Sequence, residues 1–142
     1  MKTLRKNPFR SYRLTMLGSA IALVPLGYLL RFYGPGPAWL DDALGSAIYE
    51  IFWIALGLGI WPNVAPLKIA AIIGIATCAL EILQLWHPPF LQALRATLPG
   101  RLILGTTFSW RDFPAYLGGS IVGYGWGRSR LPRRAPSQTP LP

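Results

Sequence analysis

Two charged side chains lie inside apolar stretches, where they could bind a ligand or hold helices together. Glu81 and Gln84 are three residues apart in "CALEILQLW", so a helix would place both side chains on one face. Glu50 lies in a second apolar stretch, on a stripe of semi-polar residues at helical spacing. Because an ionised side chain in hydrocarbon costs about 2.5–3.5 kcal/mol or more, we expect both glutamates to face the protein interior, towards hydrogen-bond donors.

A polar cluster is predicted from where these carboxylates lie relative to the arginines that follow them. The short turn "PNVAP" joins the two apolar stretches, so their helices run antiparallel, and Glu50 and Glu81 lie in the same half of the pair. Arginine binds phosphate and carboxylate groups through two parallel hydrogen bonds. Arg95 and Arg101 would therefore hold an anionic ligand, while the acidic and amide side chains orient them. The predicted polar cluster, for ligand binding or for structure, consists of Glu50, Glu81, Gln84, Arg95, Arg101 and Asp112.

The same residues also have purely structural interpretations. Glu81 and Gln84 could form a buried pair that joins helices without binding a ligand. Asp112 follows Ser109 at the spacing of a capping box, so it could cap a helix that begins there. Arg101 follows a Pro-Gly pair and would then lie on a solvated turn.

Several kinds of catalytic and metal chemistry have no support in the sequence. Cys78 is the only cysteine, which excludes an internal disulfide and a cysteine-based metal site. His87 has no second histidine or close carboxylate on the same helix, so we expect no metal site and no cofactor. Ser109 lacks the strand-to-helix elbow of a catalytic serine, and no nucleophile with an adjacent base is visible. An enzyme acting on lipid is therefore the least favoured class.

The composition indicates a membrane protein. The chain has 142 residues, of which 52% are hydrophobic and 13% are charged, against about 25% charged residues in a soluble domain. A transmembrane helix needs about 20 mostly apolar residues, and four runs approach this length. We predict an all-α polytopic protein with a four-helix transmembrane bundle, in a single domain over residues 1–130. The predicted spans are residues 14–30, 44–61, 67–86 and 109–127.

The segment between the third and fourth predicted spans is too apolar for a solvated loop and too broken for a spanning helix. Pro88 and Pro89 end the third helix. "PFLQALRATL" is typical of one short helix, and Pro99 and Gly100 predict a turn after it. We expect this segment to lie at the membrane interface or to re-enter the membrane. Residues 131–142 are Pro-rich and are predicted to form a disordered tail.

The basic residues predict how the protein is oriented. The formal net charge is +9, and most basic residues precede the first apolar run or follow the last one. This placement is typical of a membrane-orientation signal and not of a nucleic-acid-binding surface. Both termini should then be cytoplasmic, in a bacterial inner membrane, with a thylakoid membrane as the alternative. Arg95, Arg101 and Arg111 would lie outside, so we expect them to meet carboxylates there.

Glycines repeat every four residues in the last predicted span. Gly119, Gly123 and Gly127 would lie along one face of a helix, and a bare face lets another helix pack closely. We expect this face to pack within the bundle, against the first or third helix. A partner protein is the alternative.

The third predicted span and the residues after it resemble a known family. "EILQLWHPP" and "LRATLPGRLILGTTFSWRDFPAYLGG" are similar to a family of small bacterial membrane proteins of unknown function, over roughly residues 40–127. More distantly, the chain is similar to the VanZ-like proteins, which share a Glu-x-x-Gln, then an Arg, then an Asp that begins a Gly-rich last helix. The matching positions here are Glu81, Gln84, Arg101, Asp112 and Gly118 or Gly119.

The resemblance implies little about activity. VanZ-like proteins are linked to low-level resistance to a lipidated glycopeptide antibiotic, and the closer family has no assigned activity. This chain also departs from the closer family in the second helix. Ser46 stands where that family usually has an aspartate and Tyr49 where it has a tryptophan, and Glu50 could replace the missing charge one turn later.

Two functions follow as hypotheses. In the first, the polar cluster binds an amphiphile or lipid headgroup, so that membrane lipid is the partner. In the second, the protein is an accessory subunit of a larger assembly, and the cluster only fixes the fold against other membrane protein subunits. Transport is less favoured, because four short helices show no clear inverted repeat.

Overall fold

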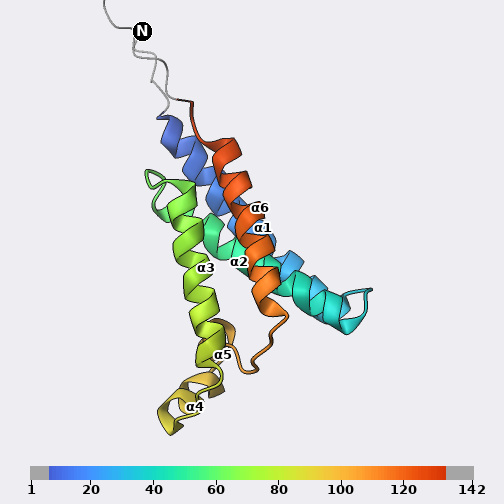
Figure 1. The fold of residues 1–142 in the computed structure, drawn as a ribbon. Coiled ribbons are helices and arrows are strands. Elements are labelled where there is room, and N and C mark those ends of the chain that lie inside the picture. The colour runs from blue at the N-terminus through green and yellow to red at the C-terminus, as the bar shows by residue number, and fades with distance from the viewer. Residues whose placement is uncertain (1–6, 134–142) are drawn as a thin grey trace, which may run out of the picture.

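The structure is a computed structural model that describes residues 7–133. The described chain is helical, without strands (Figure 1). Most of the predicted disordered tail, from residue 134 onward, lies outside the described residues. The helices are α1 (Pro8–Tyr33), α2 (Ala38–Ile60), α3 (Pro66–Leu83), α4 (Pro89–Ala96), α5 (Leu98–Leu104) and α6 (Asp112–Arg130).

Three helices, α1, α2 and α3, are long and apolar enough to cross a membrane. They are consistent with a multi-pass membrane protein. Their bounds differ by a few residues from the predicted spans. For example, α1 begins earlier than predicted because Pro8 suits the first helical turn and Asn7 Oδ1 accepts a hydrogen bond from Phe9 N at 3.1 Å. The last predicted span corresponds to α6, which is less apolar and falls outside this group.

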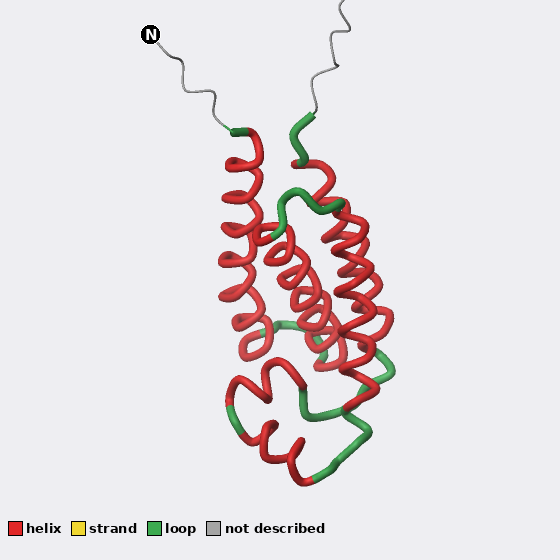
Figure 2. The backbone as a smooth tube through the Cα atoms, turned by 90° about the vertical axis from the view of Figure 1, so that its left-hand side faces the viewer, coloured by secondary structure: helices red, strands yellow, loops and turns green. Residues whose placement is uncertain are grey.

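The long helices pack around α2 and α6. Helix α2 contacts α1, α3 and α6, and α6 also contacts α3. The two ends of the described chain lie at one end of the molecule, which we call the terminal end, and α4 and α5 lie at the opposite end (Figure 2). Towards the α4–α5 end, the hairpin of α1 and α2 diverges from α3 (Figure 1). The buried hydrophobic core consists of Tyr12, Met16, Ile54, Leu58, Ile69 and Ala70.

The predicted glycine face of α6 packs within the protein, against α2. A Cβ atom built on Gly119 would lie 2.7 Å from the Ala47 carbonyl oxygen, and one built on Gly123 would lie 2.9 Å from Ile54 Cδ1. Gly127 meets Leu58 in the same way. The prediction of internal packing is therefore confirmed. The main partner of this face is α2 and not the predicted first or third helix, although a Cβ atom on Gly127 would also lie 3.5 Å from Pro66 of α3 and from Tyr12 of α1.

The segment between α3 and α6 forms two short helices where one was predicted. The predicted Pro-Gly turn is wrong, because Pro99 and Gly100 lie in the first turn of α5, where proline fits well. Thr97 Oγ1 accepts a hydrogen bond from Gly100 N at 3.1 Å and donates one to the Leu94 carbonyl at 2.7 Å. A side chain at position 100 would collide with that same carbonyl, so glycine is required there.

Candidate functional site

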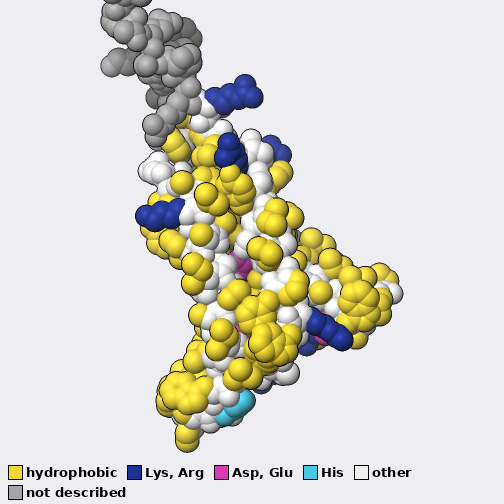
Figure 3. Space-filling view, viewed as in Figure 1, with side chains coloured by type: hydrophobic (Ala, Val, Ile, Leu, Met, Phe, Trp, Pro, Cys, Tyr) yellow, Lys and Arg dark blue, Asp and Glu magenta, His cyan; other side chains and the backbone are white. Residues whose placement is uncertain are grey.

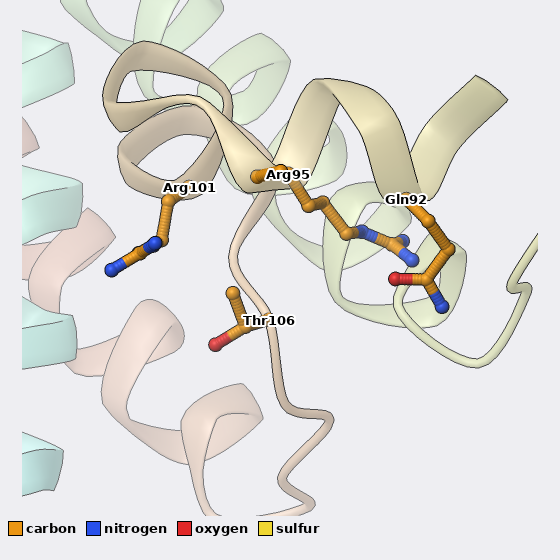
Figure 4. Close-up of a pocket in the computed structure, with 5 residues that line it drawn as sticks. Gln92, Arg95, Arg101 and Thr106 are labelled. Atoms are coloured by element: carbon orange, nitrogen blue, oxygen red, sulfur yellow. The ribbon is translucent and has the colours of Figure 1, made fainter. Parts of the chain in front are cut away.

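A pocket of about 360 Å³ lies at the α4–α5 end of the molecule (Figure 4). Arg101 and Thr106 lie on one side of it, and Arg95 lies beside Gln92 on the other (Figure 4). Ala96 completes the lining, so no acidic side chain of the described residues contributes to the wall. Two guanidinium groups, an amide and a hydroxyl make this a site rich in hydrogen-bond donors, suited to an anion.

Arg95 is held in place by the end of α3. Its side chain is buried, Nη1 donates to the Trp86 carbonyl at 2.9 Å, and Nη2 donates to the Leu83 carbonyl at 2.8 Å. The last carbonyls of a helix lack partners within the helix, and a positive charge is favourable near them. Arg95 therefore fixes α4 against α3. Its buried Nε has no hydrogen-bond partner among residues 7–133.

Arg101 is exposed on α5 and is oriented by its helix alone. The predicted meeting of arginines and carboxylates is not found for Arg95, Arg101 or Arg111. Within the described part of the chain, the one ion pair joins Arg31 and Asp42, near the α1–α2 connection. The physical reason is that Arg95 has backbone carbonyls as partners, while the carboxylates of the predicted cluster are turned into the helix interfaces.

Glu81 is buried at the junction of α3, α6 and the segment between α5 and α6. Its Oε1 accepts a hydrogen bond from Ser109 N at 2.6 Å. Its Oε2 accepts from Gln84 Nε2 at 3.0 Å and from Tyr116 OH at 3.3 Å. The predicted pairing of Glu81 with Gln84 on one helix face is confirmed, and this carboxylate joins three parts of the chain.

Gln84 also fixes the segment that forms one wall of the pocket. Gly105 has a φ of 67°, which lets the chain turn back after α5. A Cβ atom there would lie only 2.5 Å from Gln84 Nε2, so the backbone passes directly over the glutamine side chain. Thr106, the next residue, lines the pocket. Glu81 and Gln84 thus position one wall of the pocket from behind, without lining it.

The remaining two carboxylates of the predicted cluster join α2 to α6. Glu50 is fully buried, and its Oε1 accepts a hydrogen bond from Ser120 Oγ at 2.8 Å. Asp112 Oδ1 accepts from Ser46 Oγ at 2.8 Å. The alternative in which Asp112 caps α6 is therefore not found, because its side chain is bonded to another helix and makes no cap hydrogen bond.

The structure divides the predicted cluster into two groups. Arg95 and Arg101 line the pocket, whereas Glu50, Glu81, Gln84 and Asp112 lie in the helix interfaces. Sequence reasoning missed Gln92 and Thr106. Gln92 lies three residues before Arg95, a spacing that places both on one helix face and could have revealed it. Thr106 had no such signal, since its position depends on the turn at Gly105.

The chain belongs to the family described as Protein of unknown function (DUF2809), whose family model matches residues 35–120. The match runs from the start of α2 through the first half of α6, so it contains the pocket and the buried carboxylates. No solved structure matches the chain. The predicted resemblance to a family of unknown function is confirmed, and nothing links the chain to VanZ-like proteins.

Proposed function

We propose that this integral membrane protein binds the anionic headgroup of an amphiphile in the pocket between α4 and α5. The observation that carries the proposal is the lining of the pocket, which offers Arg95, Arg101, Gln92 and Thr106 and no carboxylate. Charge-assisted hydrogen bonds from arginine to phosphate or carboxylate are about twice as strong as neutral ones. An anion is therefore the favoured ligand.

The two sides of the pocket have different roles in this proposal. Arg101 is exposed, with Thr106 on the same side, and its side chain extends away from Arg95 (Figure 4), so it would turn towards a ligand on binding. Arg95 is already bonded to two backbone carbonyls, so it supplies a fixed positive charge opposite. A headgroup that spans both sides fits a volume of about 360 Å³.

The surroundings of the pocket favour an amphiphile over a free anion. Large hydrophobic side chains are exposed on the same two short helices and at the end of α3, including Trp86, Phe90, Leu94, Leu98 and Leu102. An acyl chain can lie along such a surface while the headgroup occupies the pocket. Aromatic residues such as Trp86 are typical of the membrane interface.

The proposal includes a topology in which α1, α2, α3 and α6 all cross the membrane. Helix α6 is packed against α2 and α3, so only part of its surface would face lipid and it can cross a membrane with fewer apolar residues than α1. The short helices α4 and α5 would then lie at the interface or re-enter the membrane from the far side.

Charge supports cytoplasmic termini. Several Lys and Arg side chains gather towards the terminal end on a surface dominated by hydrophobic side chains (Figure 3). Arg10, Arg13, Lys68, Arg128 and Arg130 flank the helix ends there. Basic residues favour the cytoplasmic side. In this proposal the pocket therefore faces the outer side of a bacterial inner membrane, with a thylakoid membrane as the alternative.

Native mass spectrometry of the full chain in mild detergent tests this function. Phosphatidic acid is added as the anionic probe and phosphatidylcholine as its zwitterionic control. We expect phosphatidic acid to bind wild type and Arg111→Ala alike, because Arg111 is exposed on the same segment but does not line the pocket. Arg101→Ala should weaken binding about tenfold, the loss expected for a charge-assisted hydrogen bond. Equal binding by Arg101→Ala and wild type would refute the proposal.

An accessory role in a larger membrane assembly is the second candidate. It is favoured by the carboxylates, since Glu50, Glu81 and Asp112 all make hydrogen bonds inside the protein and are turned away from the pocket. On this view, mild extraction yields the chain bound to other proteins, and Arg101→Ala leaves that complex intact.

A further inference from the structure

A second and larger hollow lies at the terminal end, between the start of α3 and the end of α6. We call it the basic groove. Its volume is about 870 Å³. It is formed by Pro66 and Leu67 on one side and by Tyr124, Arg128, Ser129 and Arg133 on the other. Apolar side chains therefore face two arginines across it, and no carboxylate of the described residues lines it.

Arg128 is oriented by its own helix. Its Nη1 donates to Tyr124 OH at 2.7 Å, and its guanidinium carbon lies 5.9 Å from the centre of the Tyr124 ring. Arginine has five N–H donors, and within residues 7–133 this is the one hydrogen bond that its side chain makes. The guanidinium is thus held at the groove with most of its donors available to a ligand.

The start of α3 adds to the positive character of the groove. Helix α3 begins after Ala65 without a side-chain cap, and Pro66 and Leu67 of its first turn line the groove. The N-terminus of a helix carries a partial positive charge. Pro66 has no N–H and Lys68 N donates to the Ala65 carbonyl at 3.0 Å, so it is this partial charge that favours an anion here. Lys68 follows directly in the sequence. This end of the helix and the two arginines favour the same kind of ligand, an anion.

The ligand class follows from the combination of charge and apolar lining. Phosphate is the common anionic group of membrane lipids, and basic residues beside the end of a membrane helix attract such lipids. A volume of about 870 Å³ exceeds the space that a phosphate ion needs. The apolar residues of the lining, which also include Leu131 and Pro132 after α6, suit the glycerol and first acyl carbons.

We propose that the basic groove binds the phosphodiester headgroup of an anionic membrane lipid, with Arg128 as the principal contact. The groove lies at the opposite end of the molecule from the α4–α5 pocket, so this site is independent of the function proposed above. It is also formed by the C-terminal half of α6, beyond residue 120, where the family match ends.

The chain offers a matched control for testing Arg128. Arg130 lies two residues later on α6 and carries the same charge. Its guanidinium lies over the Trp126 ring at 4.2 Å and does not line the groove. Arg128→Ala and Arg130→Ala therefore change the net charge equally but affect the groove differently.

The experiment is a titration of the full chain in detergent with phosphatidylglycerol, followed by native mass spectrometry, with phosphatidylcholine of the same acyl chains as control. We expect phosphatidylglycerol to bind more tightly than phosphatidylcholine. The titration is made with Arg101→Ala present in every sample, so that the α4–α5 pocket is weakened equally throughout. In that background Arg128→Ala should weaken phosphatidylglycerol binding about tenfold, while Arg130→Ala changes it less than about twofold, since Arg130 does not line the groove. Thermal unfolding of each variant in the same detergent shows that it is folded, and Arg128→Lys should keep partial binding if Arg128→Ala fails to fold.

Other outcomes would overturn the proposal. Equal losses in Arg128→Ala and Arg130→Ala would mean that net charge alone attracts the lipid. Equal binding of the two lipids would exclude recognition of the headgroup charge. Displacement of phosphatidylglycerol by millimolar inorganic phosphate would assign the groove to the free ion, whereas retention of the lipid under that condition supports the proposal.

Discussion

The acidic and basic side chains of the predicted cluster differ in what they contact. Glu50, Glu81 and Asp112 each accept hydrogen bonds from another part of the chain and lie in the interfaces of α2, α3 and α6. Arg95 and Arg101 lie at the α4–α5 end and line a pocket. The partners account for the difference, because the carboxylates accept from N–H and O–H donors on neighbouring elements, whereas Arg95 donates to backbone carbonyls and Arg101 is exposed. The acids and Arg95 hold the fold together, and Arg101 is left to face a ligand.

The largest loss of stability is expected from removing the carboxylate of Glu81. Glu81→Ala leaves the Ser109 N–H and the Tyr116 and Gln84 donors without their acceptor. Each buried unpaired donor costs about 1–3 kcal/mol, so the free energy of unfolding should fall by about 3–5 kcal/mol. Unfolding by sodium dodecyl sulfate in mixed micelles measures the change.

Glu81→Gln is the matched control for that prediction. The amide oxygen still accepts from Ser109 N, and Tyr116 OH can accept from the new amide. The Gln84 amide has to turn over, so that its buried Oε1 accepts from the new amide in place of the lost Nε2 hydrogen bond. We therefore expect a loss below about 2 kcal/mol. If Glu81→Ala is as stable as wild type, the carboxylate does not join the helices, and the contrast between acidic and basic residues disappears.

Smaller changes in the free energy of unfolding, of opposite sign, are expected at two neighbouring glycines of α6. Gly119→Ala forces a methyl group against the Ala47 carbonyl and Glu50, so stability should fall by about 1–3 kcal/mol. Gly118 has no atom within 4 Å of the corresponding position. Gly118→Ala should therefore raise stability by up to about 1 kcal/mol, because alanine favours a helix more than glycine does. The same unfolding assay measures the free energy of unfolding of both variants. Equal changes in Gly119→Ala and Gly118→Ala would mean that Gly119 does not lie in the contact between α2 and α6.

The smallest effect on stability is expected from the exposed arginine of the pocket. Arg101→Ala removes a side chain that makes no ion pair among the described residues. The free energy of unfolding should change by less than about 0.5 kcal/mol, although ligand binding weakens. A loss as large as that of Glu81→Ala would show that Arg101 is structural and would remove the basis for a separate binding site.

Local patterns predicted much of the fold and part of the site. The placement of Glu81 and Gln84 on one face, the close-packed glycine face of α6 and the short helix after Pro89 all follow from spacing within one segment. The contacts that spacing could not predict join distant parts of the chain. Asp112 is bonded to Ser46, 66 residues away, and not to its own helix.

The position of the arginines was unpredictable for a related reason. Arg95 bonds to backbone carbonyls at the end of α3, and every residue type has such a carbonyl. A pattern of residue types therefore cannot predict which backbone carbonyl an arginine will bind. The course of the chain past Gln84 depends on the positive φ of Gly105, which decides that Thr106 lies in the pocket.

The contact between Gly100 and Leu94 has a consequence for the kinetics of binding. Gly100 lies against the Leu94 carbonyl, and the Thr97 hydroxyl bridges the two helices, so α4 and α5 form one rigid angle. Arg95 holds this pair of helices against the end of α3. A ligand thus meets a preorganised backbone and has mainly the exposed Arg101 side chain to order. We expect association without a slow conformational step, so that different headgroups are distinguished mainly by how long each remains bound.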